Sequence, residues 1–178
     1  MNELEKGIDA LLKEIQKEAC SSHGDRGKLA ALRRGFSERT AHYAWPHIAP
    51  YCDITDERQR AIWLTVAASA AALAPEGLMR SNVGNMGATM RTLALGSDKG
   101  MAESVEKTLH SFEARFRRLL TCQTTEELCR HLARVVRAAA AKEKPVDVRK
   151  MFWDLQAWER RDVRDVRVEW AQGYWVKE

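Results

Sequence analysis

The amino-acid sequence predicts an all-α protein made of two small packed helical bundles. Three observations support that fold class. Alanine is the commonest apolar residue, apolar residues recur three and four positions apart along most of the chain, and no segment alternates apolar and polar residues over the length of a strand. With 178 residues, 45% of them hydrophobic and 30% charged, the chain is long enough to bury a core of its own.

In residues 1–97 the expected helices follow from apolar spacing and from the residues that begin and end them. Apolar residues from Leu4 to Ile15 occupy one face of a first helix, which a polar break follows. The sequence then predicts a short helix from Lys28 to Arg34 ended by Gly35, a helix capped by Ser37 that runs to about Trp45 before Pro46 and Pro50 interrupt it, a long helix capped by Asp53 or Thr55 that runs through Ala74, a loop over 75–87, and a short helix from about Ala88 to Leu95.

Gly96 to Gly100 is the expected boundary between an N-terminal helical domain, residues 1–97, and a C-terminal one, residues 98–178. Apolar spacing in the second domain predicts four helices. Their apolar faces carry Val105, Leu109, Phe112, Phe116 and Leu119; Leu128, Leu132, Val135 and Ala139; Val148, Phe152 and Leu155; and Val163, Val166, Trp170 and Tyr174. The six tryptophans lie on or beside apolar faces and are expected to anchor the core or an interface, with base stacking by Trp63 or Trp153 as the alternative.

No secretory or membrane-spanning segment is expected. The sequence opens on polar residues, and its longest weakly polar run, Ala61 to Ala74, is shorter than the roughly twenty residues that span a bilayer. The four cysteines contain no Cys-x-x-Cys pair, which predicts free thiols in a reducing compartment. The protein is therefore expected to be cytoplasmic and away from membranes.

No catalytic motif is recognisable: the chain has no Gly-x-x-x-x-Gly-Lys, His-Glu-x-x-His or Gly-x-Ser-x-Gly sequence. Glu113 and Asp154 lie on helices rich in arginine and are expected to form ion pairs rather than to act as acids. Cys20 and His23 stand three apart, but a zinc site would need two further ligands. Those would come from Cys52, His42, His47, Cys129 or His131. Buried thiols and surface histidines are the simpler reading, so no metal, cofactor or small-molecule substrate is expected.

Positive charge is concentrated in one part of a chain whose net charge is only +4. From Arg115 to Lys150 there are ten Lys or Arg and four Asp or Glu. At about 100° per residue, Arg130, Arg134 and Arg137 fall within roughly 60° of one another, opposite the apolar face of their helix. Glu126 is the one acidic residue four positions from any of the three.

These arginines allow two interpretations. Most charged helix faces are simply solvated. Arginine, however, binds phosphate oxygens through its planar guanidinium and stacks on bases, and a face with few acids repels itself unless a polyanion covers it. The pattern therefore favours a nucleic-acid-binding face, to which Arg33 and Arg34, and Arg58 and Arg60, add further basic points.

Several short motifs follow one another in a specific order along the chain. They are Arg-Gly-Lys-Leu-Ala-Ala-Leu-Arg-Arg-Gly at 26–35, Met-Gly-Ala-Thr-Met-Arg-Thr-Leu within 85–95, Glu-Ala-Arg-Phe-Arg-Arg-Leu-Leu at 113–120, Glu126-Glu127-Leu128 with His131-Leu132, Phe-Trp-Asp-Leu-Gln-Ala-Trp at 152–158, and Trp170 to Tyr174. In this order the chain resembles the CasB-type small subunit of the type I-E CRISPR surveillance complex, Cascade, over about residues 26–175.

The resemblance implies a two-domain helical protein without catalysis, which serves antiviral defence inside a ribonucleoprotein. Two copies would lie as a homodimer within the complex, beside the backbone subunits and the large subunit, and hold guide RNA, target DNA and the displaced strand. The residues that the resemblance assigns to this contact are Arg33, Arg34, Arg58 (or Arg60), Arg91, Arg115, Arg117 and Arg118. Arg130, Arg134 and Arg137 complete the expected set from helix geometry.

Three other functions remain open at the level of the sequence. A protein-interaction adaptor would use the arginines to meet acidic partners. A helix-turn-helix regulator would place Gly35 between two short helices and bind a specific operator. A metal hydrolase would require a bound metal ion.

Overall fold

The computed structural model describes residues 2–96, 102–162 and 164–176, without the side chains of 102–106, 108, 109 and 111. The all-α prediction is confirmed: within these residues there are α-helices and short 3-10 helices, and extended backbone pairs only at an isolated bridge between Met79 and Val146. The elements are α1 (Glu3–Cys20), α2 (Arg26–Arg33), η1 (Arg34–Phe36), η2 (Ala41–Tyr43), α3 (Trp45–Ile48), α4 (Glu57–Leu73), η3 (Ala74–Glu76), α5 (Met86–Leu95), α6 (Ala102–Thr121), α7 (Thr125–Ala141), α8 (Val148–Ala157) and α9 (Val166–Trp175).

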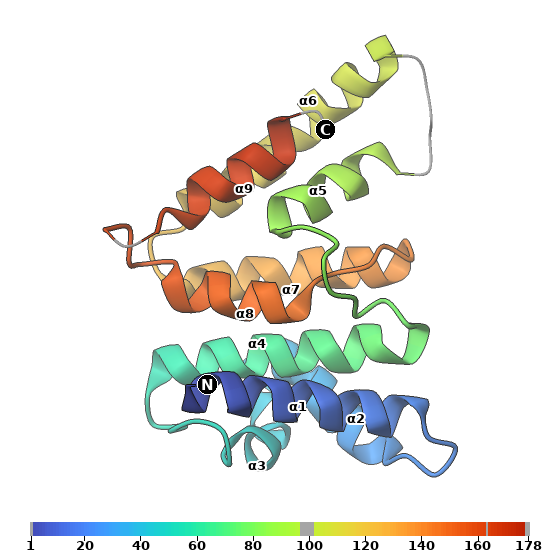
Figure 1. Ribbon diagram of the computed structural model, residues 1–178, viewed down its shortest axis with the longest axis vertical. Coiled ribbons are helices and arrows are strands. Elements are labelled where there is room, and N and C mark those ends of the chain that lie inside the picture. Colours follow the sequence, from blue (N-terminus) through green and yellow to red (C-terminus); the bar gives the residue numbers. More distant parts are fainter. Residues whose placement is uncertain (1, 97–101, 163, 177–178) are drawn as a thin grey trace.

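The helices stack in layers along the long axis of the molecule (Figure 1). Helices α1 to α3 form one end, α4 follows, α7 and α8 form the next layer, and α5, α6 and α9 form the other end. None of the helices in the described ranges is both long enough and apolar enough to cross a membrane.

Helix α4 lies at the centre because it is apolar on nearly all sides. Every residue from Ile62 to Ala71 is buried, which is typical of a helix surrounded by others. Helices α1 and α2 pack on one side of it, and α7 and α8 pack on the other. Its alanines let these neighbours approach closely, while Trp63 stacks on Tyr51 and meets Phe152 of α8 edge-on.

Helices α5 and α9 touch through glycine. A Cβ atom on Gly87 would lie 1.8 Å from the carbonyl oxygen of Trp170, and one on Gly173 would lie 2.3 Å from Asn85 Oδ1. Asn85 also begins α5, since its Oδ1 accepts a hydrogen bond from Ala88 N, and its Nδ2 donates to Glu169 O at 2.8 Å. The two helices therefore form one unit whose backbone spacing admits no larger residue at either glycine.

Three predicted helix starts are wrong. Helix α2 begins at Arg26, two residues before the predicted Lys28, because Asp25 caps it by accepting a hydrogen bond from Lys28 N. Asp56, rather than Asp53 or Thr55, caps α4 by accepting from Gln59 N, because the Asp53 carboxylate is engaged by the backbone N–H and hydroxyl of Thr55. Helix α5 begins two residues before Ala88 because Asn85 supplies its cap.

The predicted helix from Ser37 to Trp45 is also wrong. This stretch holds the 3-10 turn η2, and Pro46 lies in the first turn of α3 instead of interrupting a helix, because proline at that place loses no helical hydrogen bond. Gly35 does not end a helix in a left-handed conformation; it continues from α2 into η1 and lies against Leu64, which leaves little space for a side chain.

The expected boundary at residues 97–98 falls among residues outside the described ranges, as do Val163 and the side chains of Val105 and Leu109. The two-domain division stays a prediction. Contacts in the described residues join its two parts: α4 packs on α7 and α8, and α5 packs on α9 and α6.

Candidate nucleic-acid interface

Helix α7 turns one face to the core and the other to solvent. Thr124 begins it, with its hydroxyl accepting a hydrogen bond from Glu127 N. The buried face comprises Leu128, Cys129, Leu132, Ala133, Val135, Val136 and Ala139. Arg130, Arg134 and Arg137 are all exposed, so the structure brings these three predicted residues to one outer face, which we call the α7 arginine face.

The side chains of the α7 arginine face make only weak contacts within the chain. Arg130 lies 3.8 Å from a carboxylate oxygen of Glu38, and the two side chains are 64% and 81% exposed, so solvent screens the pair. The Arg137 guanidinium lies 5.1 Å from the ring centre of Phe36. Arg134 has neither an ion pair nor a hydrogen bond with any residue in the described ranges.

A groove adjoins this face. It has a volume of about 380 Å³ and lies between α7, α4 and the segment from Gly35 to Trp45. Trp45 lines it and is 39% exposed. Tyr43, 48% exposed, lies nearby in the chain under the Arg34 guanidinium at 4.4 Å. Glu38, Glu57 and Glu126 also line the groove, so it is not a purely cationic channel.

Helix α6 contributes a second group of predicted arginines. Arg115, Arg117 and Arg118 are exposed. Arg117 is paired with Glu113 at 2.5 Å, and this hydrogen-bonded contact lowers the pKa of the Glu113 carboxyl. Arg118 has no side-chain partner among the described residues. The expectation that Glu113 forms an ion pair is confirmed.

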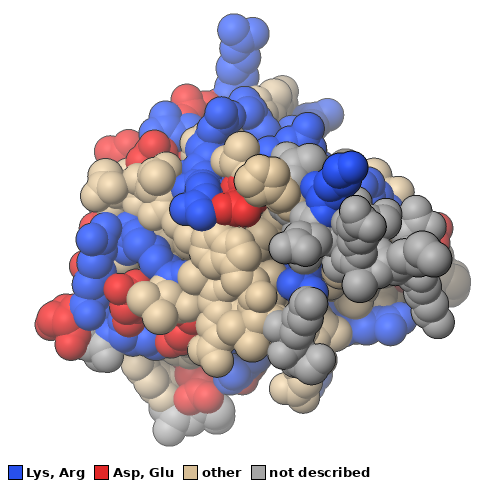
Figure 2. All heavy atoms as spheres, turned by 90° about the horizontal axis from the view of Figure 1, so that it is seen from above, with Lys and Arg blue, Asp and Glu red and all other residues tan. Residues whose placement is uncertain are grey.

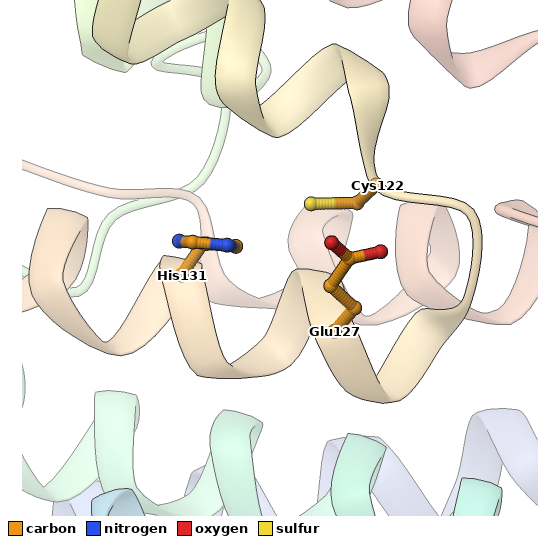
Figure 3. Close-up of side chains that lie close together, drawn as sticks. All are labelled: Cys122, Glu127 and His131. Carbon is orange, nitrogen blue, oxygen red and sulfur yellow. The ribbon is translucent and has the colours of Figure 1, made fainter.

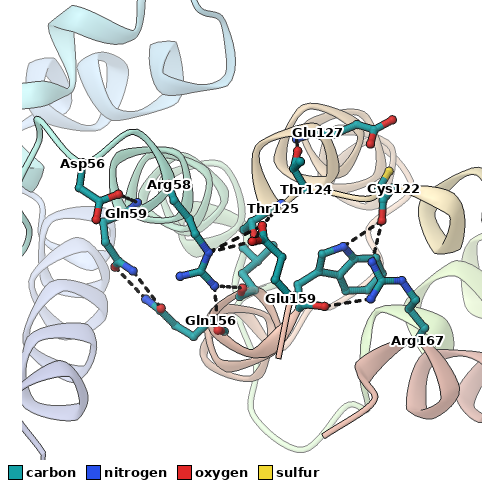
Figure 4. Close-up of polar contacts among 12 residues, drawn as sticks. Asp56, Arg58, Gln59, Cys122, Thr124, Thr125, Glu127, Gln156, Glu159 and Arg167 are labelled. Atoms are coloured by element: carbon teal, nitrogen blue, oxygen red, sulfur yellow. Dashed lines mark hydrogen bonds and ion pairs between the residues drawn. The ribbon is translucent and has the colours of Figure 1, made fainter. Parts of the chain in front are cut away.

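Arg58 holds three helices together instead of facing solvent. Its Nε donates to Thr125 Oγ1 at 3.2 Å, and its Nη2 donates to the carbonyl oxygens of Gln156 at 2.8 Å and Leu155 at 3.3 Å (Figure 4). Glu159 lies 3.8 Å away. Burial raises the pKa of Glu159, but its hydrogen bonds from Thr125 and the nearby cations outweigh this and lower it. This network, the Arg58 clamp, joins α4 to α7 and α8.

Two further predicted arginines are also engaged inside the chain. Arg91 Nη1 donates to Tyr174 O at 2.8 Å and ties α5 to the end of α9. Arg60 Nη1 donates to Ile54 O at 2.6 Å. Arg33 is exposed, and its Nε donates to Leu29 O one turn earlier in α2.

Sequence reasoning missed Arg167, which completes the C-terminal end of α6. Its guanidinium donates to the carbonyl oxygens of Leu120, Cys122 and Trp158 and lies 3.9 Å from the Trp158 ring centre. Burial lowers its pKa. Carbonyls at a helix end attract a cation, but the sequence does not indicate which distant arginine reaches them.

Asp154 is a buried ion-pair partner, as expected. It has no exposed surface and accepts hydrogen bonds from Trp170 Nε1 at 2.7 Å, Arg164 Nη2 at 2.8 Å and Lys150 Nζ at 3.3 Å. Arg164 also binds Glu169 and holds the pKa of that carboxyl below its ordinary value. The contacts of Arg164 with Asp154 of α8 and Glu169 of α9 hold these two helices in place.

The end of the molecule formed by α5, α6 and α9 carries basic side chains around an uncharged centre (Figure 2). Lys and Arg gather most densely along the upper edge of this view, with acidic residues scattered between them. In this view the basic side chains therefore lie mainly toward the edge rather than at the centre.

The zinc ligands considered from the sequence do not come together. The Cys20 thiol accepts from Gln16 Nε2, and His23 Nδ1 contacts the Ser22 hydroxyl. Among the described residues, three metal-ligating side chains do converge elsewhere: Cys122, Glu127 and His131.

The helices of the described residues place the molecule in the class of all-α proteins. A family model for the CRISPR-associated protein Cse2 matches residues 28–175, and the chain therefore belongs to the Cse2 family, the CasB-type small subunits of the type I-E Cascade. Neither the curated proteins nor the solved structures contain a match to it.

Proposed function

We propose that this protein is a non-catalytic small subunit of Cascade that binds nucleic acid without sequence specificity through the α7 arginine face. Guide RNA, target DNA and the displaced DNA strand are the proposed ligands. Base pairing elsewhere in the complex supplies sequence specificity, so this subunit needs only to hold the sugar-phosphate backbone.

One observation carries the proposal: Arg130, Arg134 and Arg137 lie together in solvent. By contrast, carbonyls and carboxylates of the chain itself engage Arg58, Arg91 and Arg164. Three aligned guanidinium groups repel one another, and a phosphate chain relieves that repulsion and releases counterions. Arg34, Arg115 and Arg118 extend the proposed cationic surface, to which Arg33 and Arg117 belong at its margins. Arg58 and Arg91 are not included, since their donors are engaged within the chain.

The groove beside α7 gives the bound strand an orientation. Its three glutamates repel phosphates, which therefore lie along the α7 arginine face rather than inside the groove. Bases pointing toward the groove would meet Trp45, and those near η1 would meet Tyr43 and its stacked Arg34. Stacking on aromatic rings tolerates any base, as a sequence-independent scaffold requires.

We place the protein in the cytoplasm, in two copies beside the backbone subunits and the large subunit. Family membership supports this placement. A protein adaptor that binds no nucleic acid is the competing function, and it predicts that partner subunits are captured equally well after nuclease treatment. The helix-turn-helix alternative has less support, because η1 and η2 follow α2 and the four-residue α3 is too short to read a groove.

The test is a charge reversal of Arg130, Arg134 and Arg137 to Glu in the full chain. Binding to single strands of scrambled sequence, measured by filter retention over a salt series, should be lost or weakened at least 100-fold. For wild type, neutralising about six phosphates gives a slope of log affinity against log salt near −4; replacing the three arginines by Gln should reduce its magnitude by about 2.

The matched control reverses Lys6, Lys13 and Lys17 to Glu. These residues are exposed on one side of α1, so the net charge changes equally while α7 stays intact. Binding should then change several-fold at most. Equal losses in both triple variants, a flat salt slope in wild type, or a strong preference for one sequence would contradict the proposal. Circular dichroism must show unchanged helicity in both variants.

A further inference from the structure

We propose that Cys122, Glu127 and His131 form a binding site for a zinc-type divalent metal ion at the junction of α6 and α7. Their ligand atoms all lie within 4.8 Å of one another. Cys122 directly follows α6, and the other two residues stand four apart on α7, so both project from the same side of that helix. In Figure 3 the Glu127 carboxylate points toward the Cys122 side chain, and the His131 imidazole lies to one side of both.

The donor set suits zinc. A thiolate, an imidazole and a carboxylate are its usual ligands, at about 2.3 Å for sulfur and about 2.0–2.2 Å for nitrogen and oxygen. Ligand atoms around one tetrahedral ion then stand about 3–4 Å apart, so side-chain rotations that move these atoms by about 1 Å complete the geometry. Three protein ligands leave one position for water.

The surroundings hold two of the ligands in place. The carbonyl oxygen of Cys122 accepts hydrogen bonds from Trp158 Nε1 at 3.2 Å and from Arg167 Nη2 at 2.7 Å, which fixes the backbone next to the thiol. One oxygen of Glu127 accepts from Gln123 N at 2.9 Å, which orients the carboxylate and leaves its other oxygen to bind an ion.

An ion must displace the thiol proton of Cys122. The Cys122 Sγ donates to Arg118 O at 3.3 Å, and burial raises the pKa of the thiol to about 11. The charge of Glu127 raises it further, while Arg167 and Arg130 lower it. A bound dication supplies a closer and larger positive charge than either arginine, and it replaces the proton directly.

The bound ion would join the end of α6 to α7 across a short connection. This junction lies between Arg118 on α6 and Arg130 on α7. Metal binding would therefore stabilise the relative positions of the two helices that carry most of the proposed phosphate-binding arginines. The site itself needs no nucleic acid, so its test is independent of that proposal.

Titration of the chelator-treated full chain with Zn²⁺, followed by calorimetry, should show one equivalent bound and a rise in the melting temperature. Co²⁺ should give the sulfur charge-transfer absorption of a thiolate ligand. Cys122→Ser should remove that absorption and weaken Zn²⁺ binding at least 100-fold. His131→Ala and Glu127→Gln, at half-buried positions on α7, should each weaken it about 10- to 100-fold.

Cys20→Ser is the control, because it removes an exposed thiol close to His23 and leaves the junction untouched. It should keep full binding. Absence of Zn²⁺ binding in wild type, retention of binding in Cys122→Ser, or loss in Cys20→Ser would overturn the site. If Cys122→Ser fails to fold, unchanged affinity in both α7 variants overturns it instead.

Discussion

The Arg58 clamp and the α7 arginine face use the same side chain in opposite ways. Arg58 is 28% exposed and gives its donors to two carbonyl groups and a hydroxyl of its own chain. Arg134, on the outer side of α7, gives none to any residue in the described ranges. Both regions lie on helices whose inner faces are buried against each other.

The difference shows that an arginine's surroundings, rather than its place in a motif, decide what it can bind. A guanidinium that satisfies helix-end carbonyls already has its partners and would leave them unpaired if it moved to a phosphate. A guanidinium in solvent gives up only hydrogen bonds to water when it binds a phosphate. The following predictions test this contrast in order of decreasing effect on stability.

The largest effect is expected for Arg58→Ala. The substitution leaves the carbonyl groups of Leu155 and Gln156 and the Thr125 hydroxyl without their donor, so the free energy of unfolding should fall by about 2 kcal/mol. Urea denaturation followed by circular dichroism measures it. A change below 0.5 kcal/mol would mean that the clamp contributes little and that Arg58 is free to bind a ligand.

A smaller effect, dependent on pH, is expected for Glu169→Gln. Arg164 holds the pKa of Glu169 below 4.5, so the pair contributes stability above about pH 4.5 that disappears as the pH falls through the lowered pKa. Wild type should therefore be more stable than the variant at pH 7, and the gap should close below pH 4. Denaturation midpoints across that range test this, and a gap that is constant with pH would contradict it.

The smallest effect is expected for Arg134→Ala. Because this side chain has no partner in the described part of the chain, stability should change by less than about 0.5 kcal/mol. Affinity for single strands should nevertheless fall, and the salt slope should shrink by about 0.7, the contribution of one phosphate contact. Loss of stability without loss of affinity would reverse the comparison.

Strong periodicity made the long helices predictable. Helix α7 buries the residues expected from its spacing, and α1 buries Ile8, Leu11 and Ile15 with Leu4 and Leu12 partly buried beside them, because one apolar face leaves few other arrangements. Short elements were less predictable. Between Ser37 and Ile48 two competing signals, Pro46 and a possible cap at Ser37, accompany 3-10 and α-helical turns that no apolar period marks.

The candidate site was predictable only where a single helix defines it. Spacing alone placed Arg130, Arg134 and Arg137 together. It could not indicate that Arg58 meets Gln156, 98 positions away, or that Arg91 meets Tyr174, 83 positions away, because backbone carbonyls have no sequence signature. The proximity of Cys122 and His131 could not be predicted either, since it depends on the turn between α6 and α7.

The glycine contact between α5 and α9 imposes an order on biosynthesis. Asn85 and Glu169, whose bond spans it, are 84 positions apart. A ribosome adding about 5–20 residues per second needs roughly 4–17 s to travel that distance. During this interval Met86 and Met90, buried in the finished molecule, have no α9 to cover them, so α5 of the nascent polypeptide should stay accessible to chaperones until α9 has been synthesised.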